Sequence, residues 1–145
     1  YTKLEKYCMK KQAKEWISFA ETDLKSAKAL IKDESLTTTA AFHVQQCVEK
    51  SLKALLELNN SKVPRIHDLL KLLKRIDNEQ IDISLSVNEE LLDQINQVYI
   101  DARYPADFGL LPEGKPSTKK VGEFINEAEN VFNQTEQIIE KYKDN

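Results

Sequence analysis

The sequence predicts an all-α protein, an up-and-down bundle of four to five helices. Three observations favour this fold class. Apolar residues recur at three- and four-residue steps over long stretches, which is the period of an amphipathic helix. Glycine and proline are scarce, with 3 and 4 copies. The chain has 145 residues, long enough to bury a core in one domain without disulfide or metal staples.

The composition is that of a soluble globular protein, with 31% charged and 41% hydrophobic residues. We expect a single domain over residues 1–145, in which residues 1–8 precede Met9 and are set apart as an extension. The formal net charge of -3 gives no global attraction to nucleic acid or to an anionic membrane, so such a partner would need a local basic patch.

The location follows from what the sequence lacks. Cys8 and Cys47 are too few for a secreted disulfide framework. No signal peptide is visible, and no apolar run approaches the ~20 residues of a membrane span. We expect a cytoplasmic protein with no membrane contact.

The first two helices are predicted from their apolar stripes. A helix over residues 10–31 is indicated by Trp16, Phe19, Ala20, Leu24, Ala27 and Leu30 or Ile31. The polar segment 32–38 then supplies residues that can cap a helix. The second helix covers 40–59, and Pro64 disfavours helical structure at Val63.

Three further helices complete the predicted bundle. A short helix over 67–76 has Asp68 in its first turn, where the helix dipole favours a carboxylate. In the loop that follows, Ile81, Ile83 and Leu85 alternate, and we expect an extended loop packed on the bundle rather than a strand.

The capping-box pattern of Ser86 to Glu89 begins a fourth helix, which runs to about Arg103. Several prolines and glycines follow, and a last helix covers about 118–141.

The second helix carries an unusual polar stripe. Its apolar residues cover more than half of the circumference, and the polar face narrows to His43, Gln46, Lys50, Lys53 and Glu57. In one account, the lysines reach water from a well-buried helix and Glu57 pairs with Lys53. In the other, the stripe lines a groove in which the ammonium groups meet phosphate and His43 and Gln46 donate hydrogen bonds.

Three local features have two explanations each. His43 and Cys47 are four residues apart, as two metal ligands on one helix would be, but no third ligand is near, so we predict no metal. His67 is either a capping or hydrogen-bonded structural residue or part of a site. Arg103 and Tyr104 precede Pro105 and fit either a helix C-terminus or a fixed corner for an anion or a stacked base.

Four motifs in order resemble the HEPN domain (higher eukaryotes and prokaryotes nucleotide-binding). They are "AETDLKSAKALI", "AAFHVQQCVEKSLKALL", "PRIHDLLKLL" and "DARYP", and together they span roughly Trp16 to Pro105. The resemblance implies a helical bundle that usually dimerises. It also implies a partner, because many small prokaryotic members form a complex with a minimal nucleotidyltransferase. Some of these pairs are toxin-antitoxin systems whose HEPN chain cleaves RNA, and other members bind nucleotides without cutting RNA.

The sequence departs from the ribonuclease branch of this family. That branch places a His four to six residues after an Arg, whereas no His follows Arg103 and the chain has only His43 and His67. In the branch, the His transfers a proton and the Arg stabilises the charge of the phosphorane.

The leading prediction is therefore a non-catalytic HEPN protein, with no cofactor and no metal. It would form a homodimer, bind a nucleotide or nucleic-acid phosphate, and partner a minimal nucleotidyltransferase. The predicted ligand-binding residues are Lys50, Lys53, Arg103, Tyr104, His43, His67 and Gln46.

Two alternatives remain. The first is an endoribonuclease toxin in which one of the two histidines approaches Arg103 through the fold. The second is a pure protein-interaction bundle, which burial of Lys50 and Lys53 against acidic residues such as Asp23 or Asp101 would favour.

Overall fold

A computed structural model describes residues 1–60, 62–79, 83–101 and 115–142 and confirms the all-α bundle. These residues form five α-helices and contain no strand. The helices are α1 (Lys3–Leu30), α2 (Thr37–Leu58), α3 (Leu69–Asn78), α4 (Glu89–Asp101) and α5 (Thr118–Lys141), with a short 3-10 turn at Glu34–Leu36. None of the described helices is long and apolar enough to span a bilayer.

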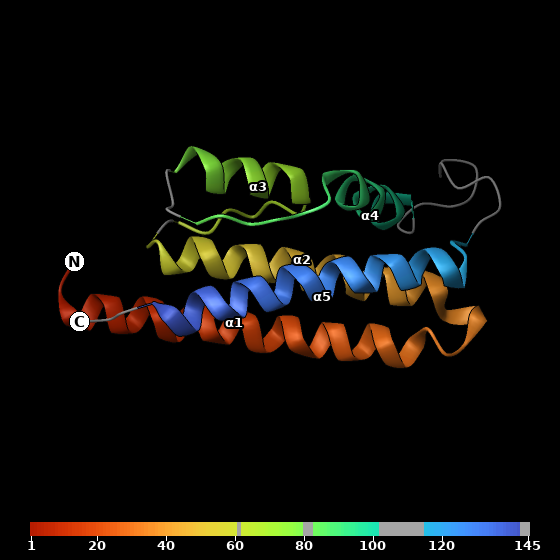
Figure 1. Ribbon diagram of the computed structural model, residues 1–145, viewed down its shortest axis with the longest axis horizontal. Helices are drawn as coiled ribbons and strands as arrows, with labels where there is room; N and C mark the ends of the chain where they lie inside the picture. Colours follow the sequence, from red (N-terminus) through yellow and green to blue (C-terminus); the bar gives the residue numbers. More distant parts are fainter. Residues whose placement is uncertain (61, 80–82, 102–114, 143–145) are drawn as a thin grey trace.

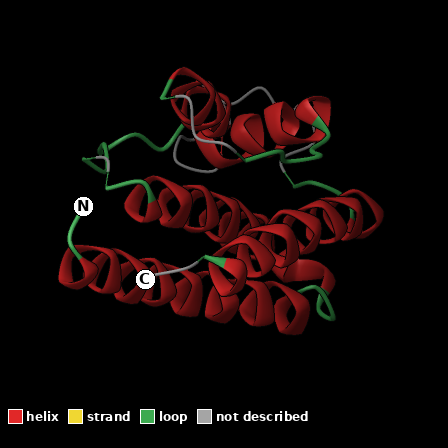
Figure 2. Cartoon of the chain, turned by 60° about the vertical axis from the view of Figure 1, so that its left-hand side comes forward, coloured by secondary structure: helices red, strands yellow, loops and turns green. Residues whose placement is uncertain are grey.

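The three long helices α1, α2 and α5 run side by side, and the shorter α3 and α4 lie across α2 on the side away from α1 (Figures 1 and 2). Helix α2 is the central element, because it contacts each of the other four helices. This position explains why apolar residues cover most of its circumference. Its side chains Leu52, Leu55 and Leu56 are fully buried.

Helix α1 begins earlier than its apolar period suggests. Thr2 is the N-cap, its hydroxyl accepts from the Glu5 N–H, and the Glu5 carboxylate accepts from the Thr2 N–H. These reciprocal hydrogen bonds are a capping box. The residues set apart as an extension are thus helical from Lys3 onward, and Met9 is 3% exposed.

Helix α3 is capped by Asp68, which lies at the N-cap and not in the first turn as predicted. Its carboxylate accepts from the backbone N–H groups of Leu70 and Lys71 at 3.0 and 3.2 Å. The Asn96 side chain of α4 also donates to this carboxylate, at 3.0 Å. The cap therefore joins α3 to α4 as well as satisfying the start of α3.

The capping box predicted at Ser86 to Glu89 is wrong. Asn88 supplies the cap, with its side-chain oxygen accepting from the Leu91 N–H at 3.1 Å. The Ser86 carbonyl instead accepts from Asn130 and Gln134 of α5, at 3.0 and 2.8 Å. Ser86 thus ties the loop to α5, and α4 begins three residues later.

The loop before α4 packs on the bundle, as predicted. Ile83 and Leu85 contact the core and are partly buried, whereas Ile81 lies outside the described residues.

One residue of the predicted apolar stripe of α1 departs from the pattern: Phe19 is 61% exposed. Its neighbours Ala20 and Leu24 are buried as expected.

Candidate functional site

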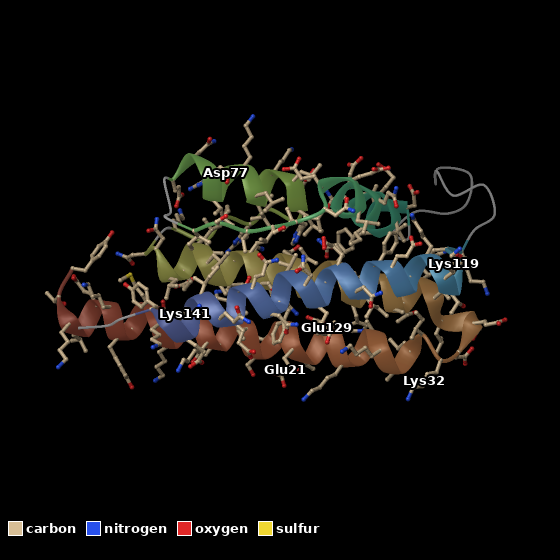
Figure 3. The ribbon with its side chains drawn as sticks, in the orientation of Figure 1. Glu21, Lys32, Asp77, Lys119, Glu129 and Lys141 are labelled. Carbon is tan, nitrogen blue, oxygen red and sulfur yellow. The ribbon has the colours of Figure 1, made fainter. Side chains whose placement is uncertain are left out.

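The polar residues of α2 differ in burial from the charges on the outer faces of the bundle. Lys32, Lys119 and Lys141 are exposed and lie at the periphery (Figure 3). In α2, by contrast, Glu49 is 4% exposed and Lys53 6%. Burying a charge is costly unless it is paired and hydrogen-bonded, so the partners of these residues determine what α2 can do.

The first group of partners is the Asp23 cluster, made of Asp23 from α1 and His43 and Lys50 from α2. One oxygen of the Asp23 carboxylate is 2.8 Å from His43 Nδ1, and the other is 2.6 Å from Lys50 Nζ. Asp23 is 7% exposed. The Lys50 ammonium also lies 5.9 Å from the centroid of the Phe19 ring, a cation–π distance.

The second group is the Glu49 cluster, made of Gln45, Glu49 and Lys53 from α2 and His67 from the segment before α3. One Glu49 oxygen accepts from Gln45 Nε2 at 3.1 Å and from His67 Nδ1 at 2.9 Å. The other accepts from Lys53 Nζ at 3.1 Å. A carboxylate with three donors can be buried at a tolerable cost.

This cluster corrects the ion pair predicted between Lys53 and Glu57. Lys53 pairs with the carboxylate four residues before it, Glu49, instead of the one four residues after it. Glu57 accepts a hydrogen bond from Trp16 Nε1 of α1 at 3.3 Å. Both spacings suit an ion pair on a helix, and burial decides between them because Glu49 is the carboxylate that needs a cation.

Amides extend the Glu49 cluster, and rings link it to the Asp23 cluster. Gln46 Nε2 donates to Gln45 Oε1 at 2.7 Å, and Gln45 Nε2 donates to the His67 carbonyl at 2.7 Å. Phe42 contacts the rings of both His43 and Tyr99, with centroids 5.4 and 5.8 Å apart. Tyr99 in turn lies 6.5 Å from His67. Segments far apart in sequence thus form one continuous face around α2.

The carboxylates fix the state of both imidazoles. An ionised carboxylate only accepts hydrogen bonds, so Nδ1 of His43 and of His67 must carry the proton. In the neutral ring, Nε2 is then the unprotonated nitrogen, on the far side of the ring from the carboxylate. The His43 side chain is 27% exposed and that of His67 54%, so both rings are open to an incoming group.

The formal charges of the two clusters cancel while the imidazoles are neutral. Asp23 balances Lys50, and Glu49 balances Lys53. Protonation of His43 or His67 would give the face a net positive charge. The attraction of this face for an anion therefore depends on the histidines.

Cys47 takes no part in this chemistry. Its side chain is fully buried, and burial, with the negative charge of Asp23, raises the pKa of the thiol to about 12. A thiol with such a pKa is an inert core residue. No group of three metal-ligating side chains occurs within the described ranges, and His43 directs Nδ1 to Asp23 rather than toward Cys47.

Five of the seven predicted site residues fall within the described chain. His43 meets Lys50 at Asp23, His67 meets Lys53 at Glu49, and Gln46 donates to Gln45 of the Glu49 cluster. Arg103 and Tyr104 lie outside the described residues.

The sequence interpretation missed the role of the anchoring residues. Gln45, Glu49 and Lys53 are spaced by four and so share one face of the helix, a signal that was available. Asp23, on another helix, was named only as an acid that Lys50 or Lys53 might be buried against.

The comparisons with known proteins agree on one family. The model of the family described as "HEPN domain" matches residues 13–144. A protein of Methanocaldococcus jannaschii named "Putative toxin MJ1304" is 34% identical over 142 residues, which cover 91% of each chain.

Two solved structures are similar. TT1696 from Thermus thermophilus has a TM-score of 0.64 and 25% identity, covering 87% of this chain and 97% of its own. ST0689, described as an archaeal HEPN homologue, has a TM-score of 0.61 and 23% identity over 88% and 97%. The second comparison, at this identity, concerns the fold alone.

Proposed function

This chain belongs to the HEPN domain family, and from that premise we propose that it binds the phosphate of a nucleotide or of a nucleic acid through His43 and His67. We further propose that it does so without catalysis, as a homodimer in complex with a minimal nucleotidyltransferase. The observation that carries the phosphate proposal is the pair of imidazoles held through Nδ1 by buried carboxylates. In each ring Nε2 is the nitrogen that the carboxylate does not hold, and from it a protonated ring donates to a phosphate oxygen.

The lysines contribute differently from the sequence prediction. Lys50 and Lys53 are each paired with a carboxylate, so their charges are largely neutralised within the protein. They stabilise the ionised Asp23 and Glu49, which orient the histidines. Burial of both lysines against acidic residues also favours the pure protein-interaction bundle. A direct binding measurement must therefore distinguish phosphate binding from a role in protein interaction alone.

Isothermal titration with ATP, GTP and a short single-stranded RNA tests the phosphate proposal. The variants His43→Asn and His67→Asn keep a donor for the carboxylate and remove Nε2. We expect wild-type protein to bind, and each variant to bind about tenfold more weakly, the effect of one charge-assisted hydrogen bond.

Lys141→Gln, on the exposed end of α5, is the control and should bind as wild type does. If millimolar ligand produces no heat, the phosphate proposal is contradicted and the pure protein-interaction bundle is favoured.

The proposed assembly is tested separately. Light scattering of the purified chain should give the mass of two copies. Co-expression with a minimal nucleotidyltransferase from the same genome should give a complex that stays intact through gel filtration. A monomer would contradict the homodimer, and separate elution would contradict the partner.

A second candidate is an endoribonuclease toxin. A histidine oriented by a carboxylate is the arrangement of a general base, and two such pairs occur here. The related protein of M. jannaschii carries the name of a toxin. Induced expression should then arrest growth, and His67→Asn or Arg103→Ala should restore it. Normal growth with intact cellular RNA would argue against cleavage.

A further inference from the structure

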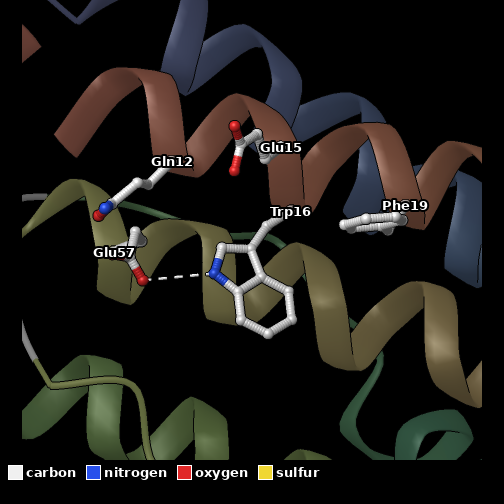
Figure 4. Close-up of a pocket in the computed structure, with 5 residues that line it drawn as sticks. All are labelled: Gln12, Glu15, Trp16, Phe19 and Glu57. Atoms are coloured by element: carbon white, nitrogen blue, oxygen red, sulfur yellow. Dashed lines mark hydrogen bonds between the residues drawn. The ribbon is translucent and has the colours of Figure 1, made fainter. Parts of the chain in front are cut away.

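A pocket between α1 and α2 is lined by none of the residues that make up the two clusters, although it borders them. It is lined by Gln12, Glu15, Trp16, Phe19 and Glu57 and has a volume of about 270 Å³ (Figure 4). In the close-up, the Glu57 carboxylate lies beside the indole nitrogen, the Glu15 carboxylate lies above the indole, the amide of Gln12 points away from it, and the Phe19 ring lies farther along α1. The pocket thus combines an aromatic wall with two carboxylates.

The aromatic wall is held in place. Trp16 Nε1 donates to Glu57 at 3.3 Å, which fixes the indole across the boundary between the helices. Lys53 Nζ lies 5.8 Å from the indole centroid and supports it from the buried side of α2. Phe19 is 61% exposed, an unusual position for a large apolar ring, and Lys50 Nζ lies 5.9 Å from its centroid.

The charges at the pocket favour a cation. In the part of the chain that the structure describes, neither Glu15 nor Glu57 forms an ion pair. Lys53 and Lys50, whose ammonium groups lie 5.8 and 5.9 Å from the Trp16 and Phe19 ring centroids, are paired with Glu49 and Asp23. Among the residues that line the pocket, the charged ones are the two glutamates, so the lining itself is acidic.

We propose that this pocket is a docking site for an arginine side chain of a partner protein. A guanidinium is planar, stacks on aromatic rings and donates to carboxylates in a fork. Trp16 and Phe19 offer the rings, and Glu15, Glu57 and the Gln12 carbonyl offer the acceptors. The volume suits one side chain, and the exposed Phe19 adds apolar area that a polypeptide around the arginine would cover.

This inference is independent of the phosphate proposal. Glu57 follows His43 by fourteen positions on α2, which places them about 20 Å apart along the helix axis. The pocket's negative charge would also repel a phosphate, so the two sites select ligands of opposite charge. Loss of one activity in a variant therefore need not affect the other.

Trp16 is the only tryptophan of the chain, so intrinsic fluorescence reports on this pocket. The full chain is titrated with the peptide N-acetyl-Ala-Arg-Ala-amide and, in parallel, with the same peptide containing citrulline. Citrulline has nearly the same shape without the charge. We expect a saturable change in emission with the arginine peptide and at least about fivefold weaker binding of the citrulline peptide. Equal responses, or no saturation with arginine, would overturn the proposal.

Glu15→Gln keeps the size of the side chain and removes its charge. We expect it to weaken binding of the arginine peptide about fivefold. Glu21→Gln makes the same change on the same helix, at a carboxylate paired with Lys25 outside the pocket, and should leave binding unchanged. Circular dichroism establishes that both variants fold. A Glu15→Gln variant that binds as the control does would also overturn the proposal.

Discussion

Glu49 is the residue on which the interior of this molecule depends most directly. It is 4% exposed and accepts hydrogen bonds from Gln45, Lys53 and His67. Lys53, at 6% exposed, has no route to keep its ammonium hydrated as a surface lysine does. Each charge is tolerated because the other is present, and removal of one leaves the other buried without compensation.

This coupling gives a prediction for unfolding in urea. Glu49→Ala should lower the free energy of unfolding by about 3 kcal/mol or more, because Lys53 is left as an unpaired buried charge. The double variant Glu49→Leu with Lys53→Met replaces the pair by apolar side chains of similar size. It should be more stable than Glu49→Ala, by about 2 kcal/mol.

Lys25→Met, at an exposed ion pair on α1, is the matched control and should change stability by less than about 1 kcal/mol. A Glu49→Ala variant as stable as this control would show that Lys53 finds another partner or reaches water.

The start of α1 shows how a capping motif can begin a helix where the apolar side chains are not buried. Leu4 and Tyr7, close to this end of the helix, are 70% and 55% exposed. Burial therefore does little to hold this turn, and the capping box at Thr2 and Glu5 has that role. The hydrogen bond from the Thr2 backbone N–H lowers the pKa of Glu5 below its ordinary value.

The start of α1 should therefore loosen in acid. Because the pKa of Glu5 is lower in the folded chain, the ionised carboxylate stabilises the cap above the ordinary pKa of a glutamate. This contribution is lost as the pH falls through the lowered value. Amide hydrogen exchange, corrected for its intrinsic pH dependence, should show less protection at pH 3 than at pH 6 for the amides of Glu5 and Lys6, which donate to the Thr2 hydroxyl and carbonyl. Glu5→Gln should weaken this pH dependence. Unchanged protection of the wild-type protein at pH 3 would contradict the prediction.

The same elements show how far sequence reasoning reaches. The bounds of α5 were predicted correctly, because its apolar residues recur from Val121 to Ile139, with only the buried Thr135 interrupting them between Phe132 and Ile138. The start of α1 was missed, because exposed residues leave no periodic signal. The Asp23 cluster could not be derived, since its contacts join positions 20 and 27 residues apart and depend on how two helices pack. The ring contacts of Tyr99 depend on packing in the same way.

For the molecule as a whole, the central place of α2 sets the pattern of cooperativity. It contacts α1, α3, α4 and α5, and its core residues such as Leu52 are fully buried. No other helix touches all the rest to a comparable extent in the described chain. The bundle should therefore unfold as one unit and not helix by helix.

Two probes can test this cooperativity. Trp16 fluorescence reports on the contact of α1 with α2, and far-ultraviolet circular dichroism reports on all helices. The two urea transitions should coincide in wild-type protein. Leu52→Ala should shift both together, with a loss of about 3 kcal/mol. A fluorescence transition that separates from the dichroism would mean that part of the bundle survives when α1 leaves.

The central position of α2 also affects how freely its sequence can change during evolution. The helix that fills the interior also carries His43 and Glu49, so the constraints of packing and those of the proposed phosphate site act on the same twenty-two positions of Thr37–Leu58. Over evolutionary time, such a segment has little freedom to drift, whereas the outward faces of α1 and α5 can change with few penalties. New specificities would then arise mainly by altering what surrounds α2, on a scaffold that itself stays nearly fixed.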